Sequence, residues 1–565
     1  MAVEIYMPKN GMDMTEGTLI RWLKNVGDHV EQGEPIMEIE TDKVTMESEA
    51  PAAGTLLKKL YKDGDVVPVL TTIGYIGAPD ELPPENTSPS AAAPAKDAAP
   101  DGEEGDTYDV AVIGGGPAGY VAAIRAAQLG ARVVLFEKDT VGGTCLNRGC
   151  IPTKTFLKTA EYMHHIKNAA SRGIRINGAV SVNMPEVIRC KNKVVKTLTD
   201  GVAALLRSNG VLTVNGEARL LSPTSIACGG TTYHTKKVIL CGGSKAVRIP
   251  IPGIDSKHVL TSTEILNLPE LPETLCIIGG GVIGCEFASA FQSFGSKVVI
   301  VEQMNRLAAI MDQDVSAEIE KCMRKEGVEI HLGEGVQEIV EKDGRAHVVT
   351  DTLDIACDKI LLSIGRVPDT DCLGALKDQI RTEKGRVLVD DTMKTSVDTI
   401  YACGDINGRA MLAHTAFKMG EAAAENCVNG TAEPCDLKTV PNVIYTLPEA
   451  ACVGLTEAQA REQYPDGIRI GKFPMAANGR SVASGETEGF VKVITDAKYG
   501  EILGVHIVGA SAAEMIAEPA SLISSEVTVH EVVSKMIHAH PSYEEAFAEA
   551  CGDALNRCIH LPAKK

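Results

Sequence analysis

Apolar and polar residues alternate in short runs over the first 78 residues, a pattern that predicts β-strands joined by tight turns. The segment 17–30 is repeated at 54–67 with a constant offset of 37. Both copies turn at a Gly-Asp pair, at Gly27 and again at Gly64. Two similar copies of strand and turn predict a small, pseudo-symmetric β-sandwich.

A different pattern follows residue 106, where continuous apolar strands alternate with helical periodicity. An apolar strand, a glycine-rich turn, a helix, a second apolar strand and a glutamate succeed one another up to Glu137. The same order recurs 165 residues later and ends at Glu302. This is a βαβ unit present twice, so we expect two Rossmann-like α/β domains.

The pattern changes again from about residue 436, where strands at 443–445, 490–494 and 502–507 and helices at 512–525 and 543–556 predict an α+β domain. Residues 79–106 contain six prolines, six alanines and eight acids but one large aliphatic residue, and so cannot bury a core. They predict a flexible linker. The expected multidomain order is an all-β domain at 1–78, the linker at 79–106, a first dinucleotide-binding domain in two parts at 107–256 and 380–435, a second at 257–379, and an α+β interface domain at 436–565.

Composition and charge narrow the class of function. Hydrophobic residues make up 44% and charged residues 23% of the 565 residues, which is ordinary for a globular protein. The formal net charge of −20 argues against binding to a phosphate backbone, so we expect no nucleic-acid partner. No uncharged stretch reaches the ~20 residues of a membrane-spanning helix. With no secretory signal in the sequence, we expect a cytoplasmic protein.

The two glycine-rich turns have the spacing of dinucleotide-binding motifs. In such units the pyrophosphate lies at the helix N-terminus and the acid at the end of the next strand binds a ribose hydroxyl. Two copies predict two dinucleotides held face to face; the alternative is that one copy is a structural duplicate. A carboxylate at Glu302 repels a 2′-phosphate, which favours NAD over NADP.

Cys145 and Cys150 follow directly after the first βαβ unit. In a regular helix their Cα atoms would lie ~8 Å apart, beyond the ~7 Å limit for a disulfide. Bridging them requires a distorted turn, which we expect at Gly149. The spacing alone favours two unrelated buried thiols, whereas the position beside a dinucleotide site favours a strained, easily reduced disulfide.

The run GGTCLNRGCIPTK at 142–154 resembles the redox-active segment of the flavin disulfide reductase family, in particular of the dihydrolipoamide dehydrogenases. The likeness extends from about Tyr108 to the C-terminus, through GGS at 242–244, GRVP at 365–368, GD at 404–405 with MLAH at 411–414, and HAHPSYEE at 538–545. Small departures are Cys241-Gly242, where Ala-Thr is usual, and Cys403 before Gly404. The resemblance implies FAD at the first Rossmann unit, NAD at the second, and a homodimer in which the C-terminal domain of one subunit completes the other's site.

The same resemblance implies two sets of cofactor-binding residues. Those implied for FAD are Gly114, Gly116, Gly119, Glu137, Gly143, Thr144, Lys154, Ala218, Gly243, Ser244, Asp405, Met411, Leu412, Ala413 and His414. Those implied for NAD are Gly279, Gly281, Val282, Ile283, Gly284, Glu286, Glu302, Val336 and Gly365. Asp405 is expected to bind a ribityl hydroxyl of FAD; the alternative is an ordinary turn residue.

Catalytic roles are implied in the same way. Cys145 is expected to exchange with the substrate thiol and Cys150 to lie nearest the flavin. Lys154 is expected beside the flavin ring, paired with Glu286; the alternative is a solvated surface pair.

His540 is the expected base, and Glu545 the residue that orients it. The alternative for His540 is a metal site shared with His538. No nearby carboxylate or cysteine cluster completes such a site in the sequence, so we expect no metal.

Lys43 lies between the two repeat copies, where a pseudo-symmetric sandwich has its central hairpin. Its Asp-Lys-Val context resembles the attachment hairpin of lipoyl domains more than that of biotin carriers, whose lysine is usually flanked by methionines. We therefore expect a lipoyl group on Lys43.

Together, the resemblances imply an NAD-dependent flavoprotein that oxidises dihydrolipoyl groups. The implied partners are lipoyl-bearing acyltransferase and dehydrogenase subunits of a 2-oxoacid, acetoin or glycine-cleavage complex. The alternatives are a reductase of glutathione or mercuric ion, or a lipoyl carrier whose reductase half is inert.

Overall fold

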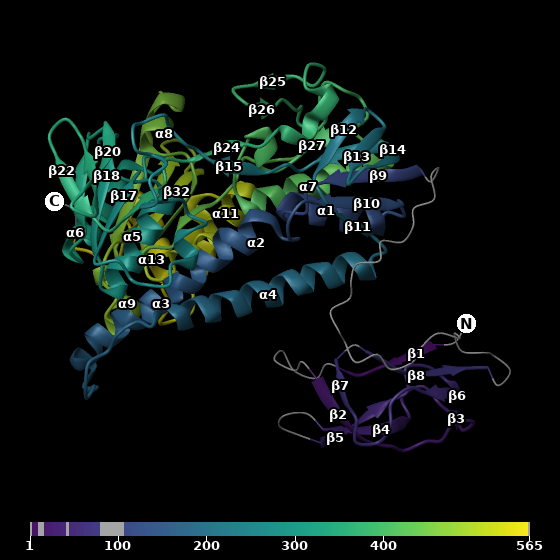
Figure 1. Ribbon diagram of the computed structural model, residues 1–565. Coiled ribbons are helices and arrows are strands. Elements are labelled where there is room, and N and C mark those ends of the chain that lie inside the picture. The colour runs from purple at the N-terminus through teal and green to yellow at the C-terminus, as the bar shows by residue number, and fades with distance from the viewer. Residues whose placement is uncertain (1–2, 9–15, 41–44, 70, 79–106, 563–565) are drawn as a thin grey trace. The chain divides into compact units, whose positions relative to one another are not determined.

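The chain forms two compact units in a computed structural model, Met1–Asp101 and Gly102–Lys565 (Figure 1). The structure describes residues 3–8, 16–40, 45–69, 71–78 and 107–562. The predicted linker at 79–106 lies outside the described residues, and so does Lys43.

The N-terminal unit is a sandwich of two four-stranded antiparallel sheets, in the orders β1-β8-β6-β3 and β5-β4-β2-β7. Its strands are β1 (Val3–Tyr6), β2 (Glu16–Trp22), β3 (His29–Val30), β4 (Pro35–Glu40), β5 (Thr45–Glu49), β6 (Gly54–Lys59), β7 (Val66–Pro68) and β8 (Thr72–Gly77). The short strand of each repeat copy pairs with the long strand of the other: β3 with β6, and β7 with β2. This exchange confirms the predicted pseudo-symmetric sandwich.

The backbone hydrogen bonds of the N-terminal unit obey the same offset of 37. Leu56 N donates to Asp28 O over 2.9 Å, and Leu19 N donates to Asp65 O over 2.9 Å. Leu19 and Leu56 are both fully buried, so the equivalent residues of the two copies meet in one core. The repeat in the sequence therefore corresponds to a repeat in both hydrogen bonding and packing.

The first Rossmann-like sheet has the order β11-β10-β9-β14-β13-β12, with β27 also paired to β14. Its strands are β9 (Thr107–Ile113), β10 (Val133–Glu137), β11 (Leu212–Asn215), β12 (Ala218–Ser222), β13 (Ser225–Cys228), β14 (Thr231–Leu240) and β27 (Ile400–Ala402). The central strands β9, β10, β11, β14 and β27 are parallel, as predicted. Chain segments on either side of the second Rossmann-like domain thus share one sheet.

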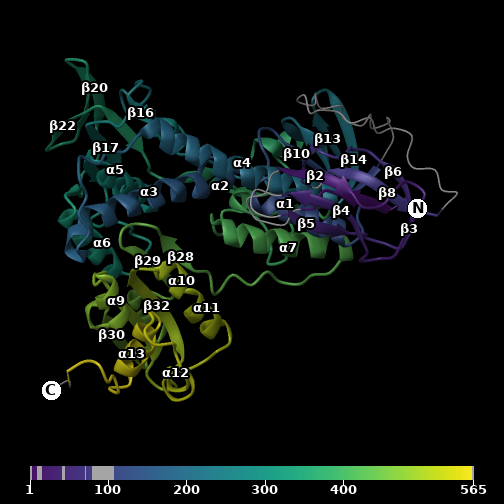
Figure 2. The ribbon, with the colours of Figure 1, turned by 90° about the horizontal axis from the view of Figure 1, so that it is seen from below.

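Helices cover this first sheet and extend from it. They are α1 (Pro117–Gln128), α2 (Gly143–Arg148), α3 (Cys150–Asn168), η1 (Ala169–Arg172), α4 (Met184–Ser208), η4 (Asp405–Asn407) and α7 (Ala413–Asn429). Alanines on α1 pack against α7, whereas α3 packs against both α4 and α5 (Figure 2). Because α3 leaves the first domain to contact α5 of the second, residues on α3 reach both domains.

The second Rossmann-like sheet is parallel throughout, in the order β16-β23-β17-β18-β19. Its elements and those around it are β15 (Ser244–Ala246), β16 (Val259–Leu260), η2 (Ile265–Asn267), β17 (Thr274–Ile278), α5 (Val282–Phe294), β18 (Lys297–Glu302), α6 (Gln313–Lys325), β19 (Glu329–Leu332), β20 (Glu338–Lys342), β21 (Arg345–Val349), β22 (Asp354–Cys357), β23 (Lys359–Leu362), β24 (Arg366–Pro368), η3 (Asp371–Leu376), β25 (Thr382–Glu383) and β26 (Arg386–Val387). The unit β17-α5-β18 repeats β9-α1-β10, which confirms the second predicted duplication.

The C-terminal domain is an antiparallel sheet, β28-β29-β32-β31-β30, covered by helices. Its elements are β28 (Asn442–Ile444), β29 (Glu449–Gly454), α8 (Glu457–Gln463), β30 (Ile468–Pro474), η5 (Met475–Ala477), α9 (Gly479–Ser484), β31 (Phe490–Asp496), β32 (Ile502–Gly509), α10 (Ala512–Met515), α11 (Ala517–Ser524), α12 (Val529–Lys535) and α13 (Glu545–Ala554). The α+β prediction is confirmed, but the single helix predicted at 512–525 is wrong in detail. The chain forms two short helices there, separated by the single residue Ile516, which itself keeps right-handed helical angles of φ −66° and ψ −16°.

Candidate active site

The first glycine-rich turn joins β9 to the N-terminus of α1. Gly114 has φ +104°, a conformation that side chains other than glycine rarely adopt. A Cβ on Gly119 would lie 1.7 Å from Gly114 O, so α1 can approach the turn only if residue 119 is glycine. A Cβ on Gly116 would meet only Gly143 Cα, at 3.7 Å. Gly114 and Gly119 therefore allow the turn and α1 to pack closely together. Gly116 leaves the backbone of the turn open, with no crowding by neighbouring atoms.

The second turn, between β17 and α5, repeats this geometry. Gly279 has φ +107°, and a Cβ on Gly284 would lie 2.0 Å from Gly279 O. A Cβ on Gly281 would have no described atom within 4 Å. An open backbone at a helix N-terminus fits the pyrophosphate of a dinucleotide, because its N–H groups and the helix dipole attract anions. Both glycine-rich turns have this open backbone and therefore fit a dinucleotide pyrophosphate.

Glu137 and Glu302 hold the same position in the two units. Glu137 accepts hydrogen bonds from Gly115 N at 2.7 Å and Asp139 N at 2.9 Å. Glu302 accepts from Gly280 N at 2.5 Å and from Met304 N at 2.6 Å. Each carboxylate is thus fixed beside its glycine turn. An ionised carboxylate has about four lone-pair sites, so each retains capacity for a ribose hydroxyl.

A cavity of about 1680 Å³ joins the two turns. From the residues predicted for FAD, its lining includes Gly114, Gly116, Glu137, Gly143, Thr144, Lys154, Ala218, Gly243, Ser244, Asp405, Met411, Leu412, Ala413 and His414. From those predicted for NAD, it includes Gly279, Gly281, Val282, Ile283, Glu286, Glu302, Val336 and Gly365. Gly119 and Gly284 do not line the cavity but pack their helices against the turns. The two predicted dinucleotide sites therefore open into one space.

Cys145 and Cys150 also line this cavity, on either side of a break between helices. Helix α2 ends at Arg148 and α3 begins at Cys150, while Gly149 between them has φ −135° and ψ −112°. The distorted turn predicted at Gly149 is confirmed. Both cysteines are thiols in this structure, and the Cys145 thiol hydrogen-bonds to Cys150.

The two thiols differ in acidity. The hydrogen bond to Cys150 and burial raise the pKa of Cys145 well above its usual range. That same hydrogen bond, with the nearby Lys154 ammonium, lowers the pKa of Cys150 to about 7 although burial opposes the shift. Cys150 is thus the sulfur that carries negative charge near neutral pH.

Lys154 lies one helical turn after Cys150 on α3 and forms an ion pair with Glu286 on α5. Its Nζ is 2.8 Å from Glu286 Oε1 and 3.0 Å from Oε2. The Glu286 side chain is 5% exposed and that of Lys154 31%. This pair is not a solvated surface pair, because the carboxylate is buried and both residues line the cavity.

A second polar group on the cavity wall contains a residue that the sequence analysis missed. Ser244 donates a hydrogen bond to Asp405, and Arg366 Nε donates to Ser244 Oγ at 2.8 Å. Arg366 Nη2 also donates to Ser244 O at 2.6 Å. Arg366 belongs to the GRVP motif, which gave the only sequence signal for it. It fixes Ser244, the first residue of β15, beside Asp405.

His540 and Glu545 lie on the C-terminal domain, away from the lining of this cavity. His540 Nδ1 is 2.9 Å from Glu545 Oε1, and Ser542 N donates to Glu545 Oε2 at 2.9 Å. Burial raises the pKa of Glu545, but these hydrogen bonds outweigh it and lower the pKa overall. The predicted dyad is therefore assembled, with the His540 side chain 79% exposed.

The neighbouring His538 belongs to a different pair. Its Nε2 is 2.9 Å from Glu518 Oε1 on α11, a partner that the sequence analysis missed because 20 residues separate the two. Hydrogen bonding to Glu518 raises the pKa of His538. His538 and His540 thus each face a carboxylate of their own.

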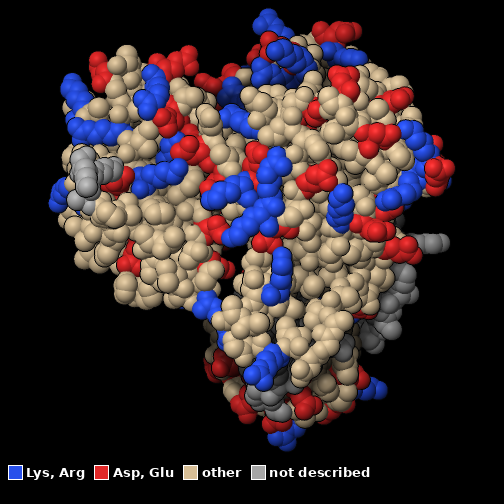
Figure 3. All heavy atoms as spheres, turned by 90° about the vertical axis from the view of Figure 1, so that its left-hand side faces the viewer, with Lys and Arg blue, Asp and Glu red and all other residues tan. Residues whose placement is uncertain are grey.

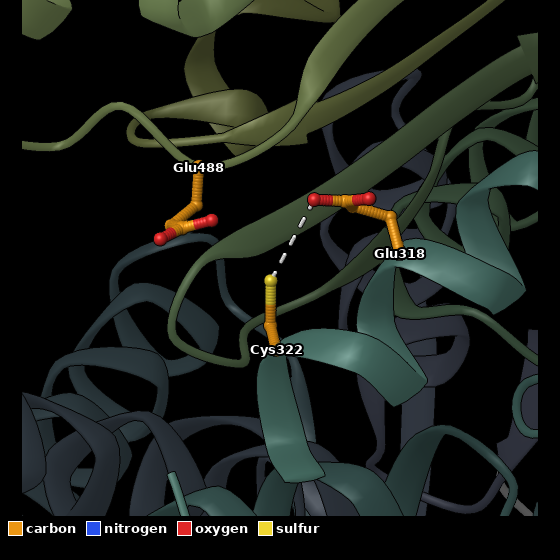
Figure 4. Close-up of side chains that lie close together, drawn as sticks. All are labelled: Glu318, Cys322 and Glu488. Carbon is orange, nitrogen blue, oxygen red and sulfur yellow. Dashed lines mark hydrogen bonds between the residues drawn. The ribbon is translucent and has the colours of Figure 1, made fainter. Parts of the chain in front are cut away.

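One group of possible metal ligands occurs among the described residues, outside the cavity: Glu318, Cys322 and Glu488 (Figure 4). Glu318 and Cys322 lie one turn apart on α6, and Cys322 Sγ is 3.9 Å from Glu318 Oε1. Both carboxylates already have cationic partners, since Lys321 pairs with Glu318 at 2.8 Å and Lys325 pairs with Glu488. The group therefore has the chemistry of a neutralised surface ion-pair cluster.

Comparison with known families agrees with this geometry. The family model described as pyridine nucleotide-disulphide oxidoreductase matches residues 108–420, and its dimerisation domain matches residues 440–551. The chain belongs to the pyridine nucleotide-disulphide oxidoreductase family. A third model, described as biotin-requiring enzyme and covering biotin and lipoyl domains, matches residues 3–76. The resemblances predicted from the motifs are confirmed for all three regions.

Individual relatives within the pyridine nucleotide-disulphide oxidoreductase family are similar over their whole length. The dihydrolipoyl dehydrogenase of Chlamydia muridarum (strain MoPn / Nigg) is 39% identical over 463 residues, which cover 81% of this chain and 99% of the relative. A dihydrolipoyl dehydrogenase of Bacillus subtilis (strain 168) is 37% identical, with 80% and 99% covered. The solved HOCl-induced flavoprotein disulfide reductase RclA from Escherichia coli superposes with a TM-score of 0.72 at 30% identity, covering 79% of this chain and 99% of that one.

Within the described part of the chain, no helix is both long and apolar enough to span a membrane. Basic and acidic side chains are interspersed over the face shown in Figure 3.

Proposed function

We propose that this oxidoreductase is a dihydrolipoyl dehydrogenase that oxidises dihydrolipoyl groups to lipoyl and reduces NAD to NADH. The observation that carries the proposal is the placement of Cys145 and Cys150 in the same cavity as both glycine turns. The relatives named dihydrolipoyl dehydrogenase support the choice of substrate. The first turn would hold FAD and the second NAD, and bound FAD would supply a two-electron relay between the thiol pair and NAD.

The cysteines carry out the exchange with substrate. A thiol of the dihydrolipoyl group attacks Cys145 Sγ in the Cys145–Cys150 disulfide, whose S–S bond breaks while Cys150 leaves as a thiolate. The second substrate thiol then displaces Cys145 from the mixed disulfide. The products are the closed lipoyl disulfide and the enzyme dithiol, so two electrons and two protons have left the substrate. The nearby Lys154 ammonium lowers the pKa of Cys150 and so favours it as the leaving thiolate.

Proton transfer is assigned to His540 of the partner subunit. Glu545 fixes the imidazole through Nδ1, which leaves Nε2 to accept the substrate proton. Because His540 does not line the cavity of its own chain, this role requires a homodimer, and the matched dimerisation domain supports one. The buried Glu286 carboxylate holds the partly exposed Lys154 ammonium near Cys150.

The N-terminal domain carries a lipoyl group on Lys43, as a tethered substrate for the complex. The match to the biotin and lipoyl domain model supports a covalently attached group, and the residues around Lys43 favour lipoyl over biotin. A tether raises the local concentration of substrate at the active site. We assign the chain to the cytoplasm, to a multienzyme complex with lipoyl-bearing acyltransferase and dehydrogenase subunits.

NADH formation from free dihydrolipoamide tests the proposal. The full-length enzyme loaded with FAD is expected to reduce NAD, whereas Cys145→Ser is expected to keep FAD and lose this activity. Oxidised glutathione with NADPH is the control substrate pair for a different disulfide reductase. Turnover of glutathione without turnover of dihydrolipoamide contradicts the assignment, and absence of both supports an inert reductase half.

A further inference from the structure

Residues from three parts of the chain meet at the Lys154 ammonium. One of these residues, Tyr445, has no role in the proposed mechanism. Lys154 is on α3, Glu286 is on α5, and Tyr445 follows β28 of the C-terminal sheet. Lys154 Nζ lies 4.3 Å from the centroid of the Tyr445 ring, over its face. Tyr445, like Lys154 and Glu286, lines the cavity.

The backbone beside Tyr445 is anchored to α5. Tyr445 N donates to Glu286 Oε1 at 3.1 Å, and Leu447 N donates to Ser289 Oγ at 3.2 Å. Both acceptors are side chains one helical turn apart on α5. The segment therefore cannot shift without breaking hydrogen bonds to the helix that carries Glu286.

The Lys154 ammonium thus has a carboxylate on one side and an aromatic face on another. Glu286 binds it through both oxygens, and the negative face of the ring attracts the same cation. Lys154 and the hydrogen bond from Cys145 both favour the Cys150 thiolate, while Glu286 opposes it. The position of one ammonium therefore matters to the acidity of the reactive sulfur.

We propose that Tyr445 is a positioning residue whose ring face holds the Lys154 ammonium between Glu286 and Cys150. The inference deepens the proposed function and rests on it for the role of Cys150. The aromatic face, not the hydroxyl, is the active part: the Tyr445 hydroxyl has no hydrogen-bond partner among the residues that the structure describes. Tyr445 acts through Lys154 and is not itself a catalytic residue.

The test replaces the ring without deleting its volume. Tyr445→Leu removes the aromatic face, Tyr445→Phe retains it, and Tyr445→Met is a second ring-free variant that fills the same space with a flexible chain. Tyr499→Leu is the matched control, because the exposed Tyr499 ring stacks with Lys498 at 4.7 Å outside the cavity lining. FAD content and thermal midpoint establish that each purified holoenzyme is folded.

The main measurement is the pH midpoint at which Cys150 of the reduced enzyme becomes reactive to iodoacetamide, read by peptide mass. In Tyr445→Leu and Tyr445→Met, the midpoint is expected to rise by about half a pH unit or more, because the ammonium is no longer held beside the sulfur. Tyr445→Phe and Tyr499→Leu are expected to keep the wild-type midpoint. The turnover number with dihydrolipoamide is expected to fall in the ring-free variants while KM stays the same.

An unchanged midpoint in a folded ring-free variant overturns the proposal, and so does an equal rise in Tyr445→Phe. This readout needs no catalytic turnover. If the wild-type enzyme does not oxidise dihydrolipoamide, the proposed function fails, while the alkylation midpoints still decide the role of Tyr445.

Discussion

Replacing Lys492 with methionine tests how the C-terminal sheet is held to the nucleotide-binding domain. Lys492 is on β31, and its side chain is 2% exposed. Its Nζ lies 2.8 Å from Asp312 Oδ1, 3.2 Å from Asp314 Oδ2 and 2.7 Å from Glu457 Oε2. Methionine keeps most of the side-chain volume but removes the charge. The substitution therefore leaves the acids of this cluster without their shared cation.

The cost is set mainly by Asp312, whose side chain is 2% exposed, as that of Lys492 is. Breaking a buried pair by removal of one partner costs about 3–5 kcal/mol, because the other charge stays buried and uncompensated. Asp314 and Glu457 are 42% and 29% exposed, so water screens them and they add little. We expect Lys492→Met to lower the free energy of unfolding of the C-terminal unit by about 3–5 kcal/mol at pH 7.

The sign of the pH dependence follows from the two pKa shifts. Burial raises the pKa of Asp312, but the hydrogen bonds from Lys492 and from Glu457 N outweigh it and lower the pKa overall. The contribution of Asp312 is therefore present above its unfolded pKa and is lost as the pH falls through its folded pKa. The pKa of Lys492 is raised overall by Asp312 and Glu457 against the effect of burial, so its contribution is lost only at alkaline pH. The deficit of Lys492→Met is thus expected to shrink in acid.

Urea unfolding followed by far-ultraviolet circular dichroism measures the effect. Trp22 is the single tryptophan of the chain and lies in the N-terminal sandwich, so its fluorescence is an internal control that should not change. The double variant Lys492→Met/Asp312→Asn keeps a capping residue at the start of α6 and removes the orphaned charge. It is expected to be less destabilised than the sum of the single variants by about 1–3 kcal/mol. An unchanged unfolding midpoint in Lys492→Met, or strict additivity in the double variant, would refute the reasoning.

Three further predictions concern the chemistry. In the reduced enzyme, the Cys150 thiolate is expected to form as the pH rises through about 7, and alkylation of Cys150 measured against pH shows this. Cys150→Ser should keep FAD but abolish dihydrolipoamide oxidation. NAD should be preferred over NADP by well over tenfold in kcat/KM, and Glu302→Ala should narrow that preference in steady-state kinetics, because the carboxylate repels a 2′-phosphate. Lys43→Arg should leave FAD content and turnover of free dihydrolipoamide unchanged but abolish the lipoyl mass increment and reduce electron flow in a reconstituted complex. Absence of a lipoyl mass increment in the wild-type protein from its lipoate-replete host, together with unchanged complex activity in Lys43→Arg, would count against the tether.

The order of the domains could be predicted because its signals are local. The repeats at offsets of 37 and 165 fix which strands and turns are equivalent, and the structure reproduces both. The break at Gly149 could be predicted only once Cys145 and Cys150 were taken as a pair, since a regular helix would hold the two too far apart to bridge. In each case neighbouring residues contain the information.

The C-terminal sheet shows where local patterns fail. The sequence analysis did not predict β29, β30 or α12. In β30 a glycine interrupts the apolar alternation, because a Cβ on Gly471 would lie 1.9 Å from Ala550 O of the helix α13 that crosses it. A tertiary contact dictates the glycine, and the glycine weakens the strand signal. The residues near Gly471 in the sequence therefore do not explain why this position is a glycine.

Two residues that join the C-terminal domain to the nucleotide-binding domain were missed for the same reason. Tyr445 and Lys492 both lie in the C-terminal domain, and both bind side chains of the preceding nucleotide-binding domain: Tyr445 that of Glu286 on α5, and Lys492 that of Asp312 at the start of α6. Their partners are 159 and 180 residues away, and neither sits in a recognisable motif. Motifs mark the groups that contact substrate and cofactor, because chemistry demands those residue types at fixed spacing. The contacts between domains require only complementary charge and shape. They therefore follow no fixed spacing in the sequence, and only the folded structure shows which residues make them.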